Sequence, residues 1–197
     1  ARQKAERVTG EKKIYMPNIT AETEEMLKRM KFVEQNNGNY IMIDILTLGY
    51  AAFQTVRNHS KLPIHCHRAM HAAITRGNHG MSMLTIAKIT RLLGGDTLHI
   101  GTAFVGKMSE SKHSTLEIER EIENPNIKKH GEILKQNWFG MKPILAVASG
   151  GLHPGHIPKL VKMMGNDVLI QAGGGVHGHP HGTLVGARAM RESVEAT

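Results

Sequence analysis

The sequence predicts an α/β protein with a parallel sheet and covering helices. Short, almost continuously hydrophobic runs recur along its 197 residues, and segments with apolar residues at helical spacing lie between them. Such runs are typical of parallel strands, because helices bury both faces of a parallel sheet. Glycine and polar residues also gather where nearly every run ends. These observations together set the fold class.

Six runs predict the strands: KIYMPNIT (13–20), YIMIDIL (40–46), LPIHCHR (62–68), DTLHIGT (96–102), PILAVAS (143–149) and DVLIQAG (167–173). An open doubly wound sheet gathers only the strand ends beside its switch point, whereas a barrel places every carboxyl end around one mouth. The polar strand ends therefore favour a TIM (β/α)8 barrel. A complete barrel has eight strands and typically about 250 residues, so the sequence predicts part of a barrel, or one that a partner completes.

Five segments predict helices: 21–35, 81–95, 114–136, 157–165 and 183–196. The first has acids in its first turn, which the helix dipole favours. The second ends in Gly94 and Gly95, as many helix C-termini do. The third is charged and is predicted to break near Pro125. No low-complexity linker or change in composition separates these elements, so residues 1–197 are predicted to form one domain.

The composition is that of an ordinary globular protein, with 40% hydrophobic residues. No apolar run approaches the roughly 20 residues of a membrane helix, and the polar first residues lack the hydrophobic region of a signal peptide. The single cysteine, Cys66, lies inside an apolar run, which favours buried packing over a catalytic thiol. We therefore expect a cytoplasmic protein with no membrane segment.

The formal charge of +8 comes from 25 Lys and Arg against 17 Asp and Glu. It indicates an anionic partner or a solvated basic surface. The basic residues are spread along the chain and only 4% of the residues are aromatic, so stacking platforms for single-stranded nucleic acid are scarce. The composition favours a small anionic substrate over nucleic acid.

Two glycine clusters follow neighbouring strands late in the sequence. They are SGGLHPGH (149–156) and QAGGGVHGHP (171–180). Successive glycines let backbone N–H groups approach a ligand, and a following helix N-terminus favours an anion. Phosphate sites recur in the loops after the last two strands of TIM barrels. The pair of clusters predicts a phosphate site, although one cluster alone fits a tight turn equally well.

The segment HCHRAMH (65–71) is the densest group of reactive side chains. His65 and His67 lie on one face of the predicted strand. Either they hold a metal with ligands from elsewhere, or His67 acts as an acid or base while Arg68 clamps an anion. His99 ends the next strand, which favours the second interpretation.

Two further segments carry candidate residues. GTAFVGKMSES (101–111) has glycines on both sides of a short apolar stretch, so it suits a lid that brings Lys107 over a substrate, or a surface loop with a solvated lysine. HGHPHG (177–182) has a composition that some metal sites share, but it better suits a loop that leads into a helix.

With these motifs assembled, the chain resembles the carboxy-terminal barrel of the large subunit of ribulose-1,5-bisphosphate carboxylase/oxygenase (RuBisCO), and within that family the archaeal form III type. The resemblance covers essentially the whole chain and rests on these stretches, in order: HCHRAMHAAI, NHGMS, LLGGDTLHIGT, VGKM, ASGGLHPGHIP and QAGGGVHGHPHG. It implies that residues 1–197 hold the third to eighth βα units of the barrel, and that the amino-terminal domain and the first two barrel strands are absent.

The resemblance also implies a role for each matching residue. His67 becomes the histidine that transfers a proton at the substrate, and Lys107 the lysine that stabilises the carboxylation transition state. The residues implied to bind the sugar and its phosphates are Arg68, His71, His99, Ser149, Gly150, Gly151, Gln171, Gly173 and Gly174. The implied reaction joins CO2 to ribulose 1,5-bisphosphate and gives two molecules of 3-phosphoglycerate, with O2 in a side reaction. Form III members are associated with AMP and nucleotide breakdown.

The family further implies Mg2+, held by a carbamylated lysine and two acids on upstream segments that the sequence does not contain. No metal ligand is therefore expected in this segment, and the isolated chain is expected to be inactive. A homo-oligomer based on dimers is also implied. Three alternatives stay open: a RuBisCO-like enolase of methionine salvage, a metal-dependent hydrolase that uses His65 and His67, and a non-catalytic module that binds phosphate or nucleic acid.

Overall fold

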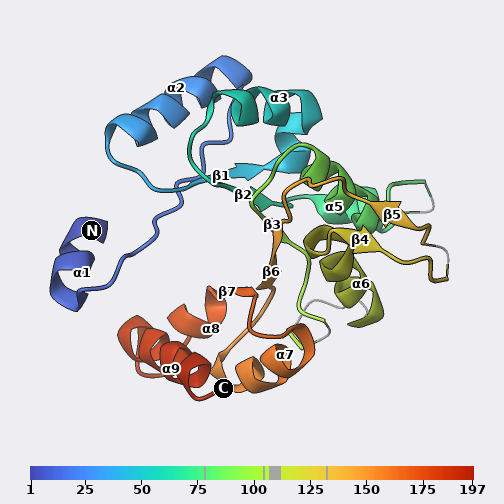
Figure 1. Cartoon of the computed structure of the whole chain (residues 1–197). Coiled ribbons are helices and arrows are strands. Elements are labelled where there is room, and N and C mark those ends of the chain that lie inside the picture. The colour runs from blue at the N-terminus through green and yellow to red at the C-terminus, as the bar shows by residue number, and fades with distance from the viewer. Residues whose placement is uncertain (78, 104, 107–111, 132) are drawn as a thin grey trace. The chain divides into compact units, whose positions relative to one another are not determined.

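A computed structural model describes residues 1–77, 79–103, 105–106, 112–131 and 133–197 (Figure 1). The chain forms two compact units. The first holds Ala1–Met81 and Ile89–Leu98, and the second holds Ser82–Lys88 and His99–Thr197. Each unit contains parallel strands and helices of its own, which confirms the α/β prediction.

The first unit contains parallel strands and the helices around them. Its elements are α1 (Arg2–Thr9), α2 (Thr23–Gln35), β1 (Ile41–Asp44), α3 (Ile45–His59), β2 (Ile64–His67), α4 (His71–Thr75), the end of α5 (Met83–Leu92) and most of β3 (Thr97–His99). β1 pairs with β2 in parallel from Ile41↔Ile64 to Asp44↔His67, and β2 pairs with β3 in parallel. The register brings the carboxyl ends of β1 and β2 to one edge.

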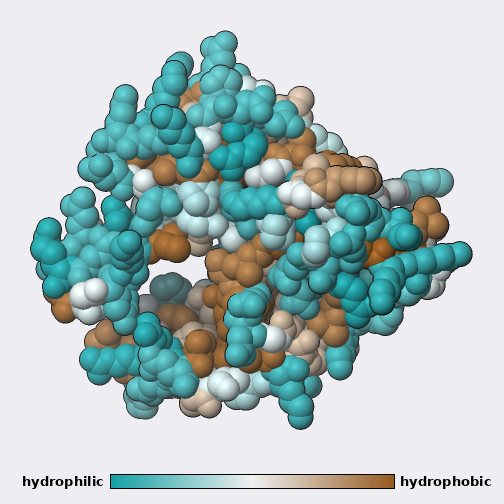
Figure 2. Space-filling view, in the orientation of Figure 1, coloured by the Kyte–Doolittle hydropathy of each residue, from teal (hydrophilic) through white to brown (hydrophobic). Residues whose placement is uncertain are grey.

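The core of the first unit lies between β1, β2 and α3. Ile41, Ile43, Phe53, Val56 and Ile64 are fully buried. Removing these apolar side chains from water is the main term that stabilises the unit. The surface over α2 is largely hydrophilic (Figure 2), as expected for an amphipathic helix that covers a core.

An ion pair fixes the point at which β2 begins. Arg57 Nη1, near the end of α3, lies 3.0 Å from Asp96 Oδ2, just before β3. The same carboxylate oxygen accepts a hydrogen bond from the Ile64 backbone N–H at 2.8 Å. Because strand residues are evenly spaced, anchoring Ile64 also sets the position of His67 at the other end of β2.

The second unit contains a parallel strand pair, a short antiparallel pair and further helices. Besides the start of α5, its elements are α6 (Lys112–Glu123), β4 (Asn126–Ile127), β5 (Gln136–Asn137), β6 (Leu145–Ser149), the 3-10 helix η1 (Pro154–His156), α7 (Ile157–Met164), β7 (Leu169–Gln171), α8 (Gly174–His177) and α9 (Thr183–Glu195). β6 and β7 are parallel, with Ser149 opposite Gln171. Val147 in β6 and Leu160 in α7 are fully buried.

The structure corrects the prediction of a strand at 13–20. This segment forms only a single parallel bridge, between Asn18 and Met42. The backbone N–H of Met42 donates to Pro17 O, and Ile19 N–H donates to Met42 O, both at 3.0 Å. Pro17 has no N–H to extend the ladder, which limits the pairing to this point.

The helix predicted at 114–136 is only half right. The break near Pro125 is confirmed, because α6 ends at Glu123. The residues after Pro125 form the antiparallel pair β4 and β5, and not a second helix. Helix α3 was not predicted at all. Its first residue, Ile45, continues the hydrophobic run of β1, which hides the change from strand to helix.

The barrel itself stays a prediction, because the described residues of either unit, taken by itself, do not form a closed barrel. The other helix predictions are confirmed by α2, α5, α7 and α9. Within the part of the chain that the structure describes, no helix combines the length and apolar character needed to cross a membrane.

Candidate functional site

His67 and Asp44 lie side by side at the carboxyl ends of β2 and β1. They are register partners, and His67 Nδ1 is 2.7 Å from Asp44 Oδ1. An ionised carboxylate only accepts hydrogen bonds, so Nδ1 must carry the proton of the neutral ring. The lone pair is therefore on Nε2. A histidine held in one tautomer by a carboxylate is the arrangement that a general base requires.

The turn after β2 places Arg68 and His71. Both are buried, with 5% and 8% of their surface exposed. Met70 adopts a left-handed conformation, φ 65°, and turns the chain directly into α4. Such strain in a non-glycine residue is often found at functional sites. Burial lowers the pKa of His71 to about 4, with help from Arg68 and Arg76, so the ring is neutral at neutral pH.

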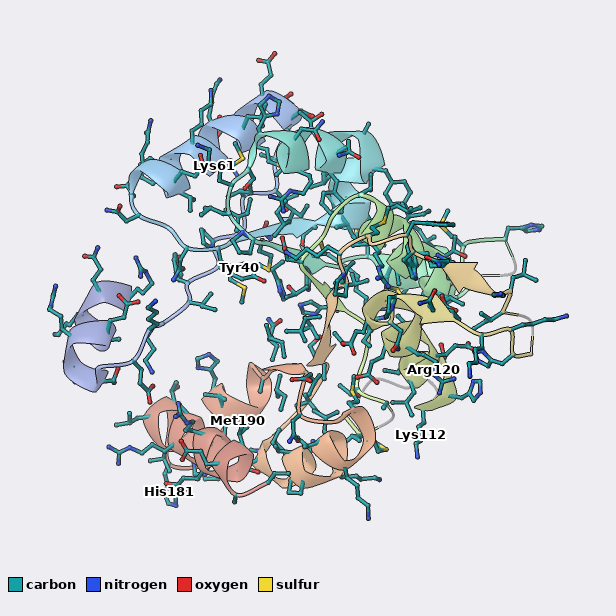
Figure 3. All side chains as sticks on the ribbon, viewed as in Figure 1. Tyr40, Lys61, Lys112, Arg120, His181 and Met190 are labelled. Carbon is teal, nitrogen blue, oxygen red and sulfur yellow. The ribbon has the colours of Figure 1, made fainter. Side chains whose placement is uncertain are left out.

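His65 occupies a different environment from His67. It is fully buried, and its Nδ1 lies 2.7 Å from Thr97 Oγ1 on β3. Burial lowers the pKa of His65 to about 4. Tyr40, just before β1 (Figure 3), also bonds to Thr97, and burial raises its pKa. Among the described residues, no three or more His, Cys, Asp or Glu side chains are grouped to hold a metal. The metal interpretation of His65 and His67 therefore gains no support.

The lone cysteine shares the interior of β2. Cys66 is fully buried, and burial raises the pKa of its thiol. A thiol that resists ionisation is a poor nucleophile. The residue therefore acts in packing, as the sequence favoured.

In the second unit, His99 and Ser149 meet at the ends of their strands. His99 Nδ1 lies 2.6 Å from Ser149 Oγ, and His99 is 3% exposed. Ser149 is in turn the register partner of Gln171, whose side chain is exposed. The structure therefore brings together three of the predicted binding residues, on β3, β6 and β7.

The two glycine clusters contact each other. A Cβ on Gly175 would lie only 2.0 Å from Leu152 O and 2.8 Å from His153 Cα, so the turn after β7 packs directly on the loop after β6. Gly173 and Gly174 differ, because nothing lies within 4 Å of the place where their Cβ would be. The predicted adjacency of the two clusters is confirmed. The open faces of Gly173 and Gly174 leave the backbone accessible to a ligand.

The loop after β6 is also met by the segment that follows β3. Gly150 and Gly151 have left-handed φ values of 129° and 69°. A Cβ on Gly106 would lie 2.1 Å from Gly150 O, and the Gly106 N–H donates to Thr102 Oγ1 at 3.1 Å. Lys107 comes next in the chain but lies outside the described residues, so its role stays a prediction.

The histidine-rich segment 177–182 is a loop from residue 178 onward, as predicted, and its first residue, His177, ends α8. It links α8 to α9 and carries His181, labelled in Figure 3. His177 Nδ1 lies 3.2 Å from Thr183 Oγ1, the first residue of α9. The contact ties the two ends of the loop together.

The sequence pattern did not indicate Asn18 and Thr20 as site residues, and it did not indicate a partner for His67. Asn18 Nδ2 donates to Asp44 Oδ2 at 3.1 Å, and the Asp44 backbone N–H donates to Thr20 Oγ1 at 2.8 Å. The available signal was weak: an Asn-x-Thr triplet that ends one apolar run, and an aspartate near the end of the next.

Comparisons with known proteins identify the family to which the chain belongs. Residues 1–197 match the family described as ribulose bisphosphate carboxylase large chain, catalytic domain. The chain is 50% identical over 199 residues to a ribulose bisphosphate carboxylase from Methanocaldococcus jannaschii, and 46% identical over 202 residues to one from Methanosarcina mazei. Each alignment covers 99% of this chain and 47% of the relative.

Solved structures give the same result. A dimeric archaeal Rubisco from Hyperthermus butylicus matches with a TM-score of 0.88 and 44% identity, over 99% of this chain and 46% of that chain. An octameric Rubisco from Pyrococcus horikoshii, in complex with sulfate ion, matches with a TM-score of 0.88 and 42% identity, over 99% of this chain and 44% of that chain. The chain spans about half the length of the relatives that it matches. With the family match covering every residue, this chain belongs to the RuBisCO large-chain family, within the catalytic domain.

Proposed function

We propose that the chain is part of a carboxylase that adds CO2 to ribulose 1,5-bisphosphate and gives two molecules of 3-phosphoglycerate, with O2 as a competing co-substrate. The hydrogen bond between Asp44 and His67 at paired strand ends carries the proposal. It gives a chain of this family the base that proton transfer at the substrate needs. The archaeal relatives support the archaeal form III type, for which we propose a role in AMP and nucleotide breakdown.

In this proposal His67 moves a proton at the substrate through Nε2. The ring accepts the proton on its lone pair, and the Asp44 carboxylate stabilises the imidazolium that forms. The His67 side chain is 37% exposed, whereas His65 is fully buried. Of the two histidines on β2, only His67 is therefore accessible to a ligand.

The remaining candidates bind the phosphates and the sugar. In the first unit, the buried Arg68 guanidinium makes strong charge-assisted bonds to a phosphate because little water competes there. In the second unit, the hydrogen-bonded pair of His99 and Ser149 has one remaining proton to donate to a phosphate, and the open backbone of Gly173 lets a phosphate approach closely.

We include Mg2+ in the proposed enzyme, where the bound ion supplies electrophilic support to substrate oxygens. The residues that the structure describes do not fit this ion, because no suitable group of three acidic, histidine or cysteine side chains occurs among them. The roles given to this chain therefore concern protons and phosphates. We propose that the metal ligands, including a carbamylated lysine, lie on other parts of the polypeptide.

We also propose that the chain supplies the third to eighth βα units of a TIM barrel and that its subunits form a homo-oligomer. The Rubiscos from Hyperthermus butylicus and Pyrococcus horikoshii are dimeric and octameric, which supports the second point. Lys107 is proposed as the lysine that stabilises the carboxylation transition state.

Fixation of labelled CO2 tests the proposed function. The complete polypeptide, supplied with ribulose 1,5-bisphosphate and Mg2+, is expected to form labelled 3-phosphoglycerate. A mass-verified sample of residues 1–197 alone is expected to form none, because its described residues hold no metal cluster. Exchange of substrate protons without fixation by the complete polypeptide would instead favour a RuBisCO-like enolase, and fixation by residues 1–197 would overturn the expected inactivity of the isolated chain.

Substituting Gly173→Ala is expected to weaken substrate binding without unfolding the protein. The added methyl group meets no protein atom within 4 Å, so it enters only the space that a phosphate would use. If the methyl group keeps the phosphate from the Gly173 backbone N–H, one hydrogen bond to a charged group is lost, which raises KM about tenfold or more. Steady-state KM for ribulose 1,5-bisphosphate, together with the melting temperature, makes the check. An unchanged KM in a folded variant would exclude a phosphate contact at Gly173.

A further inference from the structure

We propose that Asn18 and Thr20 are positioning residues for His67. Together they hold the Asp44 carboxylate in the orientation that keeps the His67 proton on Nδ1 and the lone pair on Nε2. The inference rests on the proposed proton transfer by His67 and deepens it. The hydrogen bonds of Asn18 and Thr20 lead to each other and to Asp44, so both residues act on His67 through Asp44.

Five hydrogen bonds connect these residues to His67. Thr20 donates to Asn18 Oδ1 from its backbone N–H at 3.0 Å and from its hydroxyl at 2.6 Å. Asn18 Nδ2 donates to Asp44 Oδ2 at 3.1 Å, and the Asp44 backbone N–H donates to Thr20 Oγ1 at 2.8 Å. Asp44 Oδ1 then accepts from His67 Nδ1 at 2.7 Å.

The direction of every bond in this network is determined. Because Asn18 Oδ1 accepts two bonds from Thr20, the amide nitrogen of Asn18 must face Asp44. The Thr20 hydroxyl donates its single proton to Asn18 Oδ1. Its oxygen therefore acts as the acceptor for the Asp44 backbone N–H. Both ends of the Asp44 carboxylate therefore receive donors. The ambiguity that usually affects an amide side chain does not arise for Asn18.

The backbone explains why these two side chains reach Asp44. Segment 17–20 runs beside β1, because Ile19 N–H donates to Met42 O and Met42 N–H donates to Pro17 O, both at 3.0 Å. Asn18 and Thr20 flank the buried Ile19, which is 2% exposed. Successive side chains of an extended segment alternate, so Asn18 and Thr20 share a side. The single bridge that replaces the predicted strand thus serves to bring Asn18 and Thr20 to the end of β1.

The electrostatic consequence concerns the two forms of His67. The titratable groups that interact with this histidine are Asp44 from β1, His65 on β2 and His71 after the following turn, and His71 in turn feels the charges of Arg68 and Arg76. The Asn18 amide donates to Asp44 Oδ2 and so spreads the carboxylate charge over both oxygens. Replacing the Asn18 amide by a second carboxylate would place another negative charge beside Asp44 and stabilise the His67 imidazolium.

Paired substitutions in the complete polypeptide test the role of Asn18 and Thr20. Thr20→Val removes the hydroxyl at equal volume, and Asn18→Ala removes the amide. Each is expected to lower kcat about tenfold with little change in KM, because the substrate contacts remain. Thr20→Ser keeps the hydroxyl and is expected to stay within about twofold of the wild type. Equal kcat values for Thr20→Val and Thr20→Ser would overturn the proposal.

The pH dependence of kcat in an Asn18→Asp variant separates an electrostatic role of Asn18 from a merely structural one. The acidic limb of the kcat profile is expected to shift to higher pH, since a second carboxylate favours the imidazolium form of His67 over the neutral base. An unshifted limb in a folded Asn18→Asp enzyme would contradict the electrostatic link through Asp44.

Nitrogen NMR of the histidine rings separates this inference from the proposed function. In the wild type, neutral His67 is expected to be protonated at Nδ1, with its signal assigned by loss in a His67→Gln variant. Thr20→Val is expected to give a mixture of the two tautomers, whereas an unchanged tautomer would contradict positioning. This spectrum needs no turnover, so a wild-type protein that fixes no CO2 would count against the proposed function alone.

Discussion

Replacing Asp44 by asparagine is expected to lower kcat for carboxylation by roughly 10²- to 10⁴-fold while the protein stays folded. The asparagine side chain has one accepting oxygen and one donating nitrogen. Asn18 Nδ2 donates to one end of the native carboxylate at 3.1 Å, so the new oxygen must face Asn18. The new nitrogen then donates to His67 Nδ1. This moves the ring proton to Nε2 and removes the lone pair that accepts the substrate proton.

The measurement is kcat from labelled CO2 fixation, with the melting temperature as a test of folding. Asp167→Asn is the matched control, because Asp167 is an exposed aspartate just before β7. His67→Asn is expected to cost about as much as Asp44→Asn, and the double variant no more than either, since the two residues act as one unit. Independent, multiplying losses would show that Asp44 works apart from His67.

The sequence predicted the chemistry of strand ends better than the partners of each side chain. His67, Ser149 and Gln171 lie at or near the ends of hydrophobic runs, and parallel strands bring such ends to one edge whatever their exact register. The hydrogen bond between His67 and Asp44 depends on register, which a single sequence does not specify for parallel strands joined through a helix.

Positions 17–20 show the limit of hydrophobic patterning. The run is apolar enough for a strand, yet Pro17 restricts the pairing with β1 to one bridge. The functional residues proposed in this segment are Asn18 and Thr20. In the hydrophobic pattern these two polar residues indicate only the end of a strand. Their role follows from bonds to Asp44, which lies more than twenty residues away in the chain and is reached only in the fold.

For the glycine clusters, the sequence gives the positions of the glycines but not the physical reason for each one. The sequence places glycines at positions 150, 151 and 173–175 and predicts that a ligand explains them. The structure divides this set by the space around each residue. Gly175 is required by backbone contact within the protein, whereas Gly173 and Gly174 face open space. Composition alone could not separate these two reasons for glycine.

Gly175→Ala is accordingly expected to destabilise the second unit. The new Cβ would lie 2.0 Å from Leu152 O and 2.8 Å from His153 Cα, both backbone atoms that no side-chain rotation can move aside. Overpacking of this kind costs roughly 1 to 3 kcal/mol, which lowers the melting temperature by roughly 2 to 12 °C for a domain of this size. The displaced loop after β6 carries Gly150 and Gly151, so KM for the substrate is expected to rise as well.

Gly174→Ala in the neighbouring position is the control for stability. It adds the same methyl group where no atom lies within 4 Å, so the melting temperature is expected to hold or rise slightly, since alanine favours α8 more than glycine does. Thermal unfolding of the two variants in the complete polypeptide decides the question, with hydrogen exchange of the α8 and α9 amides locating any loss of protection. Equal melting temperatures would mean that the loops after β6 and β7 do not pack as closely as Gly175 requires, and the adjacency of the two glycine clusters, on which the phosphate site depends, would fail with it.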